Sequence, residues 1–444
     1  MIPIVTPAEM KAIDGAAPEP LDVLIGRAGA AVARAAVELL DGTYGRRVVV
    51  VAGPGNNGAD GREAARRLER RGARCTVLDA GALPPVLPRC DLLIDAAYGT
   101  GFRDTWEPPA APDAPVLAVD IPSGVDGLTG RAGGRVLAAD RTVTFAALKP
   151  GLLFAEGAAH AGEIEVVDIG LDSSGATAWL TTAGDVAGWL PERDAAAHKY
   201  HSAVWIVAGS PGMTGAAGLV ATAAQRAGAG YVRLSSPGGE ADAPTEVVTT
   251  ALPAHGWAPQ VVAGADRFTA LAVGPGLGAG HDADVLDLVR ECALPIVVDG
   301  DGLTALGRDF EDVRGGTVVA TPHDGEYARL TGAPPGDDRI SAARDLAARS
   351  AATVVLKGEA MVIAAPDGEV LVAANGDARL ATAGTGDVLT GIIAALLAQG
   401  LDPWRAAGAG AYLLGAASDL GWRRGLVASD VAHLLPTVLE ELEH

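Results

Sequence analysis

A glycine-rich segment near the C-terminus has the residue types needed for phosphate binding and proton transfer. Gly384-Thr385-Gly386-Asp387 opens a long apolar helical pattern. Glycines at a helix start expose backbone N–H groups to a phosphate, and the helix dipole favours the phosphate's charge. An aspartate in the first turn can deprotonate a substrate hydroxyl, or it can simply cap the helix. Because the chain has no GxxxxGK[ST] motif, a P-loop enzyme is excluded.

A second glycine-rich segment, Gly53–Gly61, follows a valine-rich run and precedes a helical pattern. Three of its glycines match the GxGxxG turn, and Asp79 follows the next strand, so a NAD-dependent dehydrogenase is one alternative. A pyrophosphate turn does not require the amides of Asn56 and Asn57 or the carboxylate of Asp60. These oxygens suggest a hydroxyl-rich ligand or a hard cation.

Polar side chains also end two further strand patterns. Asp95 ends one, Asp120 ends the next, and Ser123 lies just beyond. In a doubly wound sheet the loops after the carboxyl ends of the strands meet at one crevice, so these side chains and Asn57 should converge. Each aspartate alone could be a helix or turn cap, but the recurrence of acidic strand ends favours a shared site.

The elements that must position these residues alternate along the chain as short β-rich runs and helices. The first cycle has helical patterns at Leu21–Leu40 and Ala59–Arg71, and strands at Arg47–Ala52, Arg74–Leu78, Asp91–Ala96, Val116–Ile121, Arg141–Phe145 and Glu163–Val167. The second has strands at Val204–Ala208, Leu271–Val273, Pro295–Val298, Thr317–Ala320 and Thr353–Leu356, and is strongly helical from Asp387 onward. This alternation predicts two α/β domains with parallel sheets, residues 1–180 and 188–441, divided within Asp172–Gly188.

Composition excludes several classes of protein. The 444 residues include 34 basic and 55 acidic side chains, a net charge of −21, which argues against nucleic-acid binding. Three scattered cysteines predict neither a zinc site nor disulfides. No signal peptide or membrane span is evident, so we expect a cytoplasmic protein with no membrane partner, and a homo-oligomer by default. Only four of the 34 basic residues are lysines, and the others are arginines. This bias suggests that lysine is kept where a compact ammonium is needed.

The first half resembles the NAD(P)H-hydrate epimerase domain through the ordered strings GPGNNGADG, DAAYGTG, VDIPSGVDG and TFAALKPGL. That resemblance implies a Rossmann-like three-layer αβα domain. It implies a potassium ion held by Asn57, Asp95 and Ser123. It also implies that hydrated NADH or NADPH (NADHX, NADPHX) binds Asn56, Asn57, Gly58, Ala59, Asp60, Gly99, Thr100, Gly101, Phe102, Arg103, Asp104, Thr105 and Asp120. The chain departs from the family at Ala59, where glycine is usual, and at Tyr98, where phenylalanine is usual.

The chemistry of an epimerase suits these residue types. The hydrate carries a hydroxyl on carbon 6 of the reduced nicotinamide ring, and its epimers interconvert by losing and regaining that hydroxyl through an iminium-like species. A carboxylate can move the proton and stabilise the cation. Asp95, Asp120 and Asp126 are the candidates, and the sequence does not choose among them.

The second half resembles the ADP-dependent NAD(P)H-hydrate dehydratase through HKY, AGSPGMTGAA, VGPGLG, VDGDGL, TPHDGE, LKG and AGTGDVLTGIIAALLAQGL. The resemblance implies a ribokinase-like αβα fold with Asp387 as the base. It implies that Ala216, Gly276 and His323 contact the hydrate, and that the adenine nucleotide binds Lys357, Gly358, Glu359, Ala360, Met361 and Gly386. Departures include Asp324 for the family's proline and Met361 for its usual threonine.

The implied reaction uses phosphoryl transfer to activate a leaving group. Asp387 takes the proton of the carbon 6 hydroxyl, which attacks the terminal phosphate of ADP, while glycine-loop N–H groups and magnesium stabilise the transferred charge. The ring nitrogen then expels phosphate, which gives NAD(P)H, AMP and phosphate. The alternatives are a vitamin-precursor kinase on the same fold, which leaves the first domain unexplained, a non-catalytic nucleotide sensor or scaffold, and the dehydrogenase.

Overall fold

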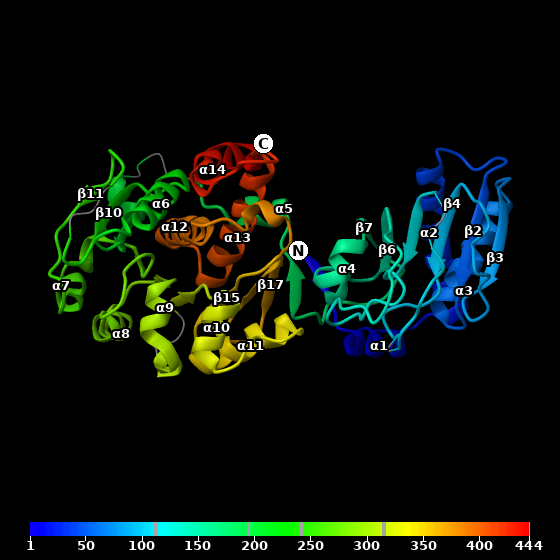
Figure 1. Ribbon diagram of the computed structural model, residues 1–444, viewed down its shortest axis with the longest axis horizontal. Helices are drawn as coiled ribbons and strands as arrows, with labels where there is room; N and C mark the ends of the chain where they lie inside the picture. The colour runs from blue at the N-terminus through cyan, green and yellow to red at the C-terminus, as the bar shows by residue number, and fades with distance from the viewer. Residues whose placement is uncertain are drawn as a thin grey trace. The chain divides into compact units, whose positions relative to one another are not determined.

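The computed structural model describes residues 1–102, 104–110, 113–192, 196, 198–239, 243–312 and 317–443. The chain forms two compact units, Ile2–Ala178 and Trp179–His444. Each unit contains a sheet of mainly parallel strands with packed helices (Figure 1), which confirms the predicted α/β class. In the described part of the chain, no helix is long and apolar enough to cross a membrane.

The first unit is built on a six-stranded parallel sheet in the order β3-β2-β4-β5-β6-β7. The strands of this sheet are β2 (Arg47–Ala52), β3 (Arg74–Asp79), β4 (Leu92–Ala96), β5 (Val116–Val119), β6 (Arg141–Phe145) and β7 (Glu163–Val167); the short strand β1 (Ile2–Ile4) lies outside it. Its helices are α1 (Pro7–Gly15), α2 (Leu21–Leu40), α3 (Asn56–Glu69), α4 (Ala155–His160) and the 3₁₀ turn η1 (Pro150–Leu152).

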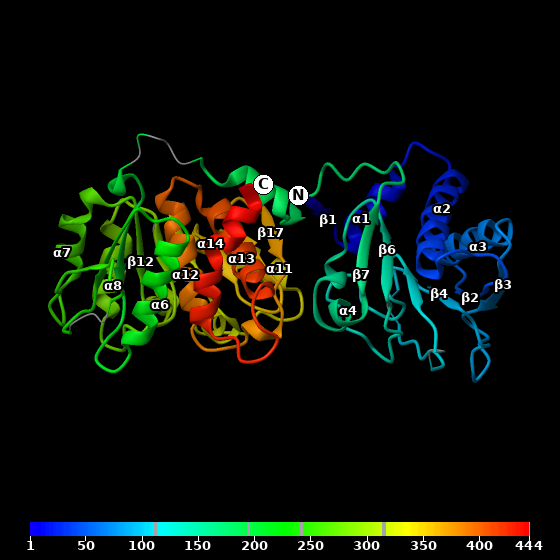
Figure 2. The same cartoon turned by 90° about the horizontal axis from the view of Figure 1, so that it is seen from above.

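The central strands of this sheet are apolar on both faces because both faces are covered. Along β2, Val48 and Val50 pack on the side of α2 and α3, whereas Val49 and Val51 pack on the opposite side, against a cluster that includes Trp106. Figure 2 shows α2 and α3 together on one side of β2, β3 and β4. The carboxyl ends of β2, β4 and β5 are therefore free to carry loops at one edge.

The second unit has a longer sheet in the order β8-β17-β16-β15-β14-β13-β12-β9-β10-β11. Its strands are β8 (Ala178–Leu180), β9 (Ala203–Val207), β10 (Tyr231–Ser235), β11 (Val248–Thr249), β12 (Ala270–Val273), β13 (Ile296–Val298), β14 (Val318–Ala320), β15 (Thr353–Leu356), β16 (Met361–Ala364) and β17 (Val370–Ala373). Pairing is parallel from β11 to β15, and antiparallel between β15 and β16 and between β16 and β17.

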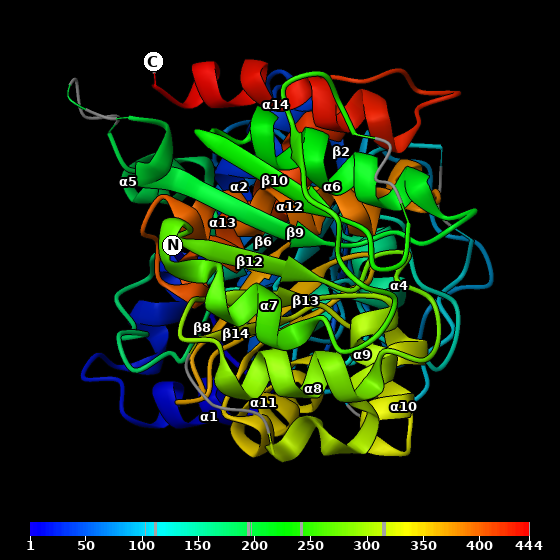
Figure 3. The same cartoon turned by 90° about the vertical axis from the view of Figure 1, so that its left-hand side faces the viewer.

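Helices cover both faces of this second sheet. They are α5 (Ala183–Trp189), α6 (Thr214–Arg226), α7 (Ala258–Ala263), α8 (Asp282–Glu291), α9 (Asp301–Leu306), α10 (Asp324–Thr331), α11 (Arg339–Ser350), α12 (Thr385–Ala398), α13 (Pro403–Asp419) and α14 (Ala428–Glu443), with 3₁₀ turns η2 (Lys199–Ser202), η3 (Ala265–Arg267), η4 (Gly307–Asp312) and η5 (Ala378–Leu380). Figure 3 shows strands β9, β10 and β12 between α6 and α14 on one side and α8 and α11 on the other.

Helix α12 is the centre of the second core and carries the glycine-rich segment at its start. Its residues from Val388 to Ala398 are all buried, as expected for a helix that is apolar all round. It packs against α6 so closely that a Cβ on Gly391 would lie 2.3 Å from the backbone oxygen of Val220. This packing fixes the N-terminus of α12 at the carboxyl edge of the sheet.

Two helices begin earlier than the sequence predicts. The Asn56–Asp60 segment is the first turn of α3 rather than a loop before a helix at Ala59. The helical stretch after Asp387 is three helices, the first of which begins at Thr385. The division between the two units lies between Ala178 and Trp179, within the predicted Asp172–Gly188 stretch. That stretch also contains strand β8 and the start of α5, which are too short to stand out in the sequence.

Candidate active sites

The first unit holds a cavity of about 490 Å³ at the carboxyl edge of its sheet, between α1, α2 and the loops after β2, β4 and β5. Eight of the predicted ligand-binding residues line it: Asn56, Asn57, Asp60, Gly99, Thr100, Gly101, Phe102 and Asp120. Four others do not, namely Gly58, Ala59, Asp104 and Thr105. Arg103 lies outside the described residues. Sequence reasoning therefore identified much of the wall of this cavity.

Asn57 projects from the first turn of α3 with an unsatisfied amide. Both Nδ2 and Oδ1 are buried and have no hydrogen-bond partner among the described residues. Gly99 passes between this side chain and Asp120, since a Cβ there would lie 3.0 Å from Asp120 Oδ2 and 3.4 Å from Asn57 Cγ. Unsatisfied buried amides cost free energy, so a ligand or ion is the natural partner for Asn57.

Asp120 is a carboxylate just after the end of β5 that is held by an ion pair and by hydrogen bonds. Its backbone has the positive φ of 68°, a strained conformation for this residue type, which ends the strand at Val119. Its Oδ1 lies 2.7 Å from Lys149 Nζ and accepts from Thr144 Oγ1, and its Oδ2 accepts from the Thr100 N–H. Burial alone would raise the pKa of Asp120, but the Lys149 charge and these hydrogen bonds outweigh it and lower the pKa.

Asp60 lines the same cavity in a very different state. It is 7% exposed and accepts no hydrogen bond from the described residues. Burial, followed by repulsion from Asp120 and Asp14, raises the pKa of Asp60 to about 8. A carboxyl group in this state is protonated at neutral pH and can donate a proton to a ligand.

Asp95 and Asp126, two candidates for proton transfer, lie elsewhere. Asp95 is fully buried and does not line the cavity; its carboxylate accepts from the N–H and Oγ of Ser123, at 2.9 and 2.6 Å. Asp126 accepts from the N–H groups of Leu128 and Thr129 and so closes a turn. The structure thus brings Asp95 together with Ser123, and both are placed to hold loops.

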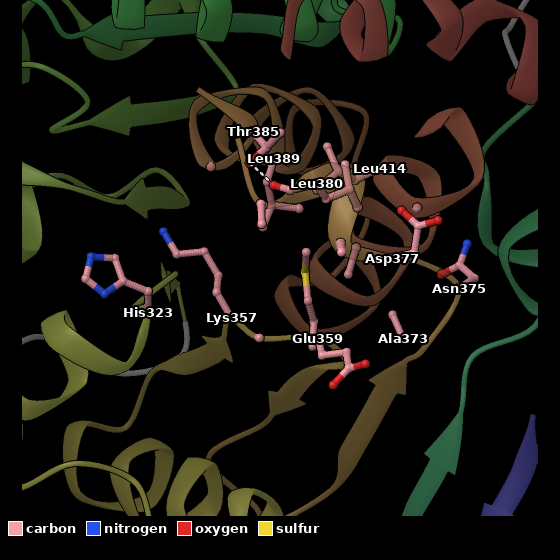
Figure 4. Close-up of a pocket in the computed structure, with 18 of the residues that line it drawn as sticks. His323, Lys357, Glu359, Ala373, Asn375, Asp377, Leu380, Thr385, Leu389 and Leu414 are labelled. Carbon is pink, nitrogen blue, oxygen red and sulfur yellow. Dashed lines mark hydrogen bonds between the residues drawn. The ribbon is translucent and has the colours of Figure 1, made fainter. Parts of the chain in front are cut away.

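The second unit holds a larger cavity, of about 610 Å³, beside the start of α12 (Figure 4). Of the expected nucleotide-binding residues, Lys357, Gly358, Glu359, Met361 and Gly386 line it, whereas Ala360 is buried away from it. His323, expected to contact the hydrate, lines this cavity too and caps α10 by accepting from the N–H groups of Gly325 and Glu326. Figure 4 shows His323 and Lys357 on one side of the cavity and Asn375 and Asp377 on the other.

Lys357 is held beside the start of α12 by buried carboxylates. Its Nζ lies 2.7 Å from Asp299 Oδ1 and 3.6 Å from Glu326 Oε2. Asp299 is fixed in turn by Thr390 of α12, whose Oγ1 donates to Oδ2 at 2.9 Å. A Cβ on Gly386 would lie 3.4 Å from Nζ, so the ammonium faces the glycine-rich turn. Burial alone would lower the pKa of Lys357, but Asp299 and Glu326 outweigh it and raise the pKa.

Asp387 occupies the first turn of α12, next to Gly386 and half-buried. It accepts no hydrogen bond from the described residues. Burial and then the charge of Asp299 raise its pKa to about 7, with Lys357 opposing them and Asp301 and Glu326 adding to them. A carboxylate with a pKa near neutrality is well suited to act as a general base.

The loop after β12 forms the other side of this region. Gly276 has a φ of +62°, and a Cβ on it would lie 2.8 Å from the Met213 oxygen and 3.1 Å from Ala216 Cβ. Two residues on, the N–H of Gly278 donates to Asp301 Oδ2. Ala216 and Gly276, both predicted to contact substrate, are therefore neighbours, and the backbone here has no room for side chains.

Sequence reasoning missed three residues of these sites. Lys149 had one usable signal, the rarity of lysine. Arg339 donates to the backbone oxygen of Lys357 and pairs with Asp324, which explains the acidic residue at that position. Asn375 lines the second cavity; its Nδ2 donates to the Tyr412 oxygen, and its buried Oδ1 has no partner. No motif marks Arg339 or Asn375.

Comparison with known proteins identifies relatives of both units. Residues 204–439 match the family described as NAD(P)H-hydrate dehydratase, and residues 21–86 and 78–151 match the family described as YjeF-related protein N-terminus. The bifunctional NAD(P)H-hydrate repair enzyme Nnr of Moorella thermoacetica is 38% identical over 99% of this chain and 97% of its own length. The Mycobacterium tuberculosis enzyme of the same name is 39% identical over 82% of this chain and 81% of its own length.

A solved structure supports the predicted fold of the second unit. A ribokinase-like superfamily protein from Enterococcus faecalis superposes with a TM-score of 0.52 at 21% identity, covering 60% of this chain and 96% of that chain. At this identity the likeness shows the fold alone. It confirms the ribokinase-like architecture expected from the sequence.

Proposed function

The chain belongs to the family of bifunctional NAD(P)H-hydrate repair enzymes, and from this premise we propose how its two sites divide the reaction. The first unit interconverts the R and S epimers of hydrated NADH or NADPH. The second dehydrates the S epimer with ADP, which becomes AMP and phosphate. Both substrates are cytoplasmic nucleotides, so the proposal includes a cytoplasmic location.

The observation that carries the proposal is the state of Asp387. It lies in the first turn of α12, beside a glycine turn that faces the Lys357 ammonium, and its pKa is raised to about 7. A base of this strength can remove the proton of the carbon 6 hydroxyl as the oxygen attacks the β-phosphorus of ADP. Backbone N–H groups at the start of α12 and the Lys357 ammonium stabilise the transferred phosphoryl group.

The second step regenerates the reduced ring. The nitrogen lone pair expels the phosphate from carbon 6, and the resulting iminium loses a proton from carbon 5. The sum is NAD(P)H, AMP and phosphate from the hydrate and ADP, with one proton released to solution. Transfer of a phosphoryl group to the hydroxyl makes it a good leaving group near neutral pH.

The lining of the second cavity favours one direction for the nucleotide. Its phosphates belong at the Lys357 and Gly386 end, and its base belongs among the apolar side chains that include Met361, Leu389 and Leu414. The fixed amide of Asn375 leaves Oδ1 as an acceptor at that end, which suits the exocyclic amino group of adenine. Met361 replaces the family's threonine with a polarisable apolar contact.

The residues present suit the two expected cations. Asn57, Asp95 and Ser123 offer amide, carboxylate and hydroxyl oxygens, and the unsatisfied Asn57 amide fits a role in holding potassium, which would fix the loops around the first cavity. The described residues contain no cluster of three metal-ligating side chains. Magnesium would therefore bind chiefly through the ADP phosphates, with Asp301 and Glu326 as nearby carboxylates, and would neutralise phosphoryl charge.

The decisive experiment incubates the purified chain with hydrated NADH and ADP. The proposal predicts recovery of the absorbance of reduced nicotinamide with equal amounts of AMP and phosphate. A stable phosphorylated product with no recovered NADH would instead indicate a small-molecule kinase. Absence of any ADP turnover would indicate a sensor or scaffold.

A further inference from the structure

The first reaction needs a proton donor that the proposed function leaves unassigned. For the carbon 6 hydroxyl to leave, its oxygen must be protonated while the ring nitrogen supplies electrons. For the other epimer to form, water must add to the opposite face and give up a proton. A single acid–base group within reach of the ring can serve both steps.

Two of the charged groups in the cavity already have protein partners. The Lys149 ammonium is 1% exposed and has an acceptor for each of its three protons: Asp120 Oδ1 at 2.7 Å, Thr144 Oγ1 at 2.8 Å and the Phe145 oxygen at 3.0 Å. It has no proton left for a ligand. Asp120 is held ionised by this pair and accepts from Thr100 and Thr144, so it can stabilise a cation but is a poor proton donor.

Among the described residues that line the cavity, two further carboxyl groups remain, Asp14 and Asp60. Asp14 lies on α1 and is exposed, at the side of the cavity that opens to solvent. Asp60 lies on α3, lines the cavity, is buried and has no hydrogen-bond partner among the described residues. Of the groups that line the cavity, it is the buried one whose carboxyl is free to engage a ligand.

We propose that Asp60 is the catalytic acid and base of the epimerase site, and that the clamped Asp120 carboxylate stabilises the iminium. This inference rests on the proposed function of the first unit. Burial and the charges of Asp120 and Asp14 keep Asp60 protonated at neutral pH, with a pKa of about 8. The Lys149 charge faces Asp120 and Asp14 and moderates this repulsion.

The steps balance without an added reagent. The Asp60 carboxyl donates its proton to the carbon 6 oxygen, the carbon–oxygen bond breaks, and the nitrogen lone pair forms the iminium double bond as water leaves. A second water adds to the opposite face of carbon 6. The proton it releases returns to Asp60 through the departed water molecule, which restores the acid and gives the other epimer.

The test follows NADH recovery from a mixture of both epimers with excess ADP, using the full chain. The S epimer disappears in a fast phase, and the R epimer follows in a slow phase that reports epimerisation above its uncatalysed rate. Asp60→Asn should reduce the catalysed slow phase by about 10²–10⁴-fold and leave the fast phase unchanged. Asp60→Glu, which keeps an acid, should restore much of the slow phase, and the matched Asp22→Asn variant, at an exposed carboxylate of α2 outside the cavity lining, should retain it.

The dependence of the epimerase rate on pH distinguishes a catalytic role of Asp60 from a structural one. The wild-type epimerase rate should fall as pH rises through about 8, where Asp60 loses its proton, and the residual rate of Asp60→Asn should lack this limb. A wild-type slow phase in Asp60→Asn, an unchanged alkaline limb in that variant, or an inactive Asp60→Glu with a normal fast phase would overturn the inference and leave the proposed function standing. Wild-type protein with a fast phase but no catalysed slow phase would overturn the epimerase function itself.

Discussion

Each cavity has a lysine–aspartate ion pair beside it, but the partner that is more exposed differs between the two pairs. In the first, Lys149 is 1% exposed and its partner Asp120 has 14% of its side chain exposed. In the second, Lys357 is 15% exposed and its partner Asp299 is 4% exposed. The Nζ–Oδ1 distance is 2.7 Å in both. One cavity therefore presents a carboxylate to its ligand, and the other presents an ammonium.

This reversal matches the charge that each proposed reaction develops. Loss of the protonated hydroxyl as water creates a cationic iminium, which the Asp120 carboxylate can stabilise. Phosphoryl transfer moves negative charge, which the Lys357 ammonium can stabilise. A further aspartate with no hydrogen bond among the described residues belongs to each site: Asp60 lines the first cavity, and Asp387 follows Gly386, which lines the second. Burial is the main cause that raises both pKa values. Two unrelated sheets thus combine a fixed ion pair with one titratable acid.

The largest expected effect comes from removing the base of the second site. Asp387→Asn should reduce ADP-dependent dehydration by about 10²–10⁴-fold, because the amide cannot accept the hydroxyl proton. Epimer interconversion, followed by separation of the R and S hydrates, should be unchanged. A parallel loss of both activities would show that the two sites do not act separately.

Lys357→Met tests the exposed ammonium. Dehydration should fall by about 10²–10³-fold, since the phosphoryl group loses one stabilising charge. The loss should appear in kcat as well as in the KM for ADP. If only the KM rises, Lys357 binds the ground-state nucleotide and does not stabilise the transition state.

Lys149→Met tests the buried ammonium, and its main effect should be on the stability of the first unit. Without Lys149 the mostly buried Asp120 carboxylate loses its ion-pair partner and keeps only its hydrogen bonds from Thr100 and Thr144, which should cost about 3 kcal/mol in the free energy of unfolding of the first unit. Urea denaturation measures this cost, and the exposed Lys11→Met is the matched control. An unchanged unfolding midpoint would refute the buried ion pair.

The smallest expected effect is a shift of a pH profile. The dehydration rate should rise with pH through about 7, as Asp387 loses its proton. Asp299→Asn removes the largest charge that raises this pKa, so the rising limb should move to lower pH. Glu326→Gln should move it in the same direction by less, and Lys357→Met in the opposite direction. The same shift for Asp299→Asn and Lys357→Met would contradict the assigned charges.

Much of the fold was predictable because apolar runs and glycine-rich turns mark the strands and the helix starts, and a parallel sheet then fixes where they meet. The valine run of β2, the turn at Gly53–Gly58 and the turn before Asp387 are each readable alone, and parallel strands then bring their ends together. The β16–β17 hairpin was missed, although Pro366-Asp367-Gly368 is a turn signal between two apolar runs. The start of α3 was missed because asparagine and glycine are weak helix formers.

The roles of the aspartates were less predictable than their positions. Asp60, Asp95 and Asp120 all lie at or after the ends of strands, yet Asp60 has no hydrogen bond among the described residues, Asp95 binds Ser123 and Asp120 is paired with Lys149. Burial and ion pairing decide these roles, and both depend on residues distant in the chain. Asn375 had no sequence signal, because only its contact with Tyr412 fixes which way its amide faces.

The most direct test of this account measures both half-reactions across pH on one preparation of the intact chain. The dehydration of pure S hydrate with ADP should accelerate as pH rises through about 7, and epimerisation should slow as pH rises through about 8. A dehydration rate that rises with pH and an epimerisation rate that falls with pH would show a base at the first of these sites and an acid at the other. Two limbs of the same sign, or two flat profiles, would contradict it.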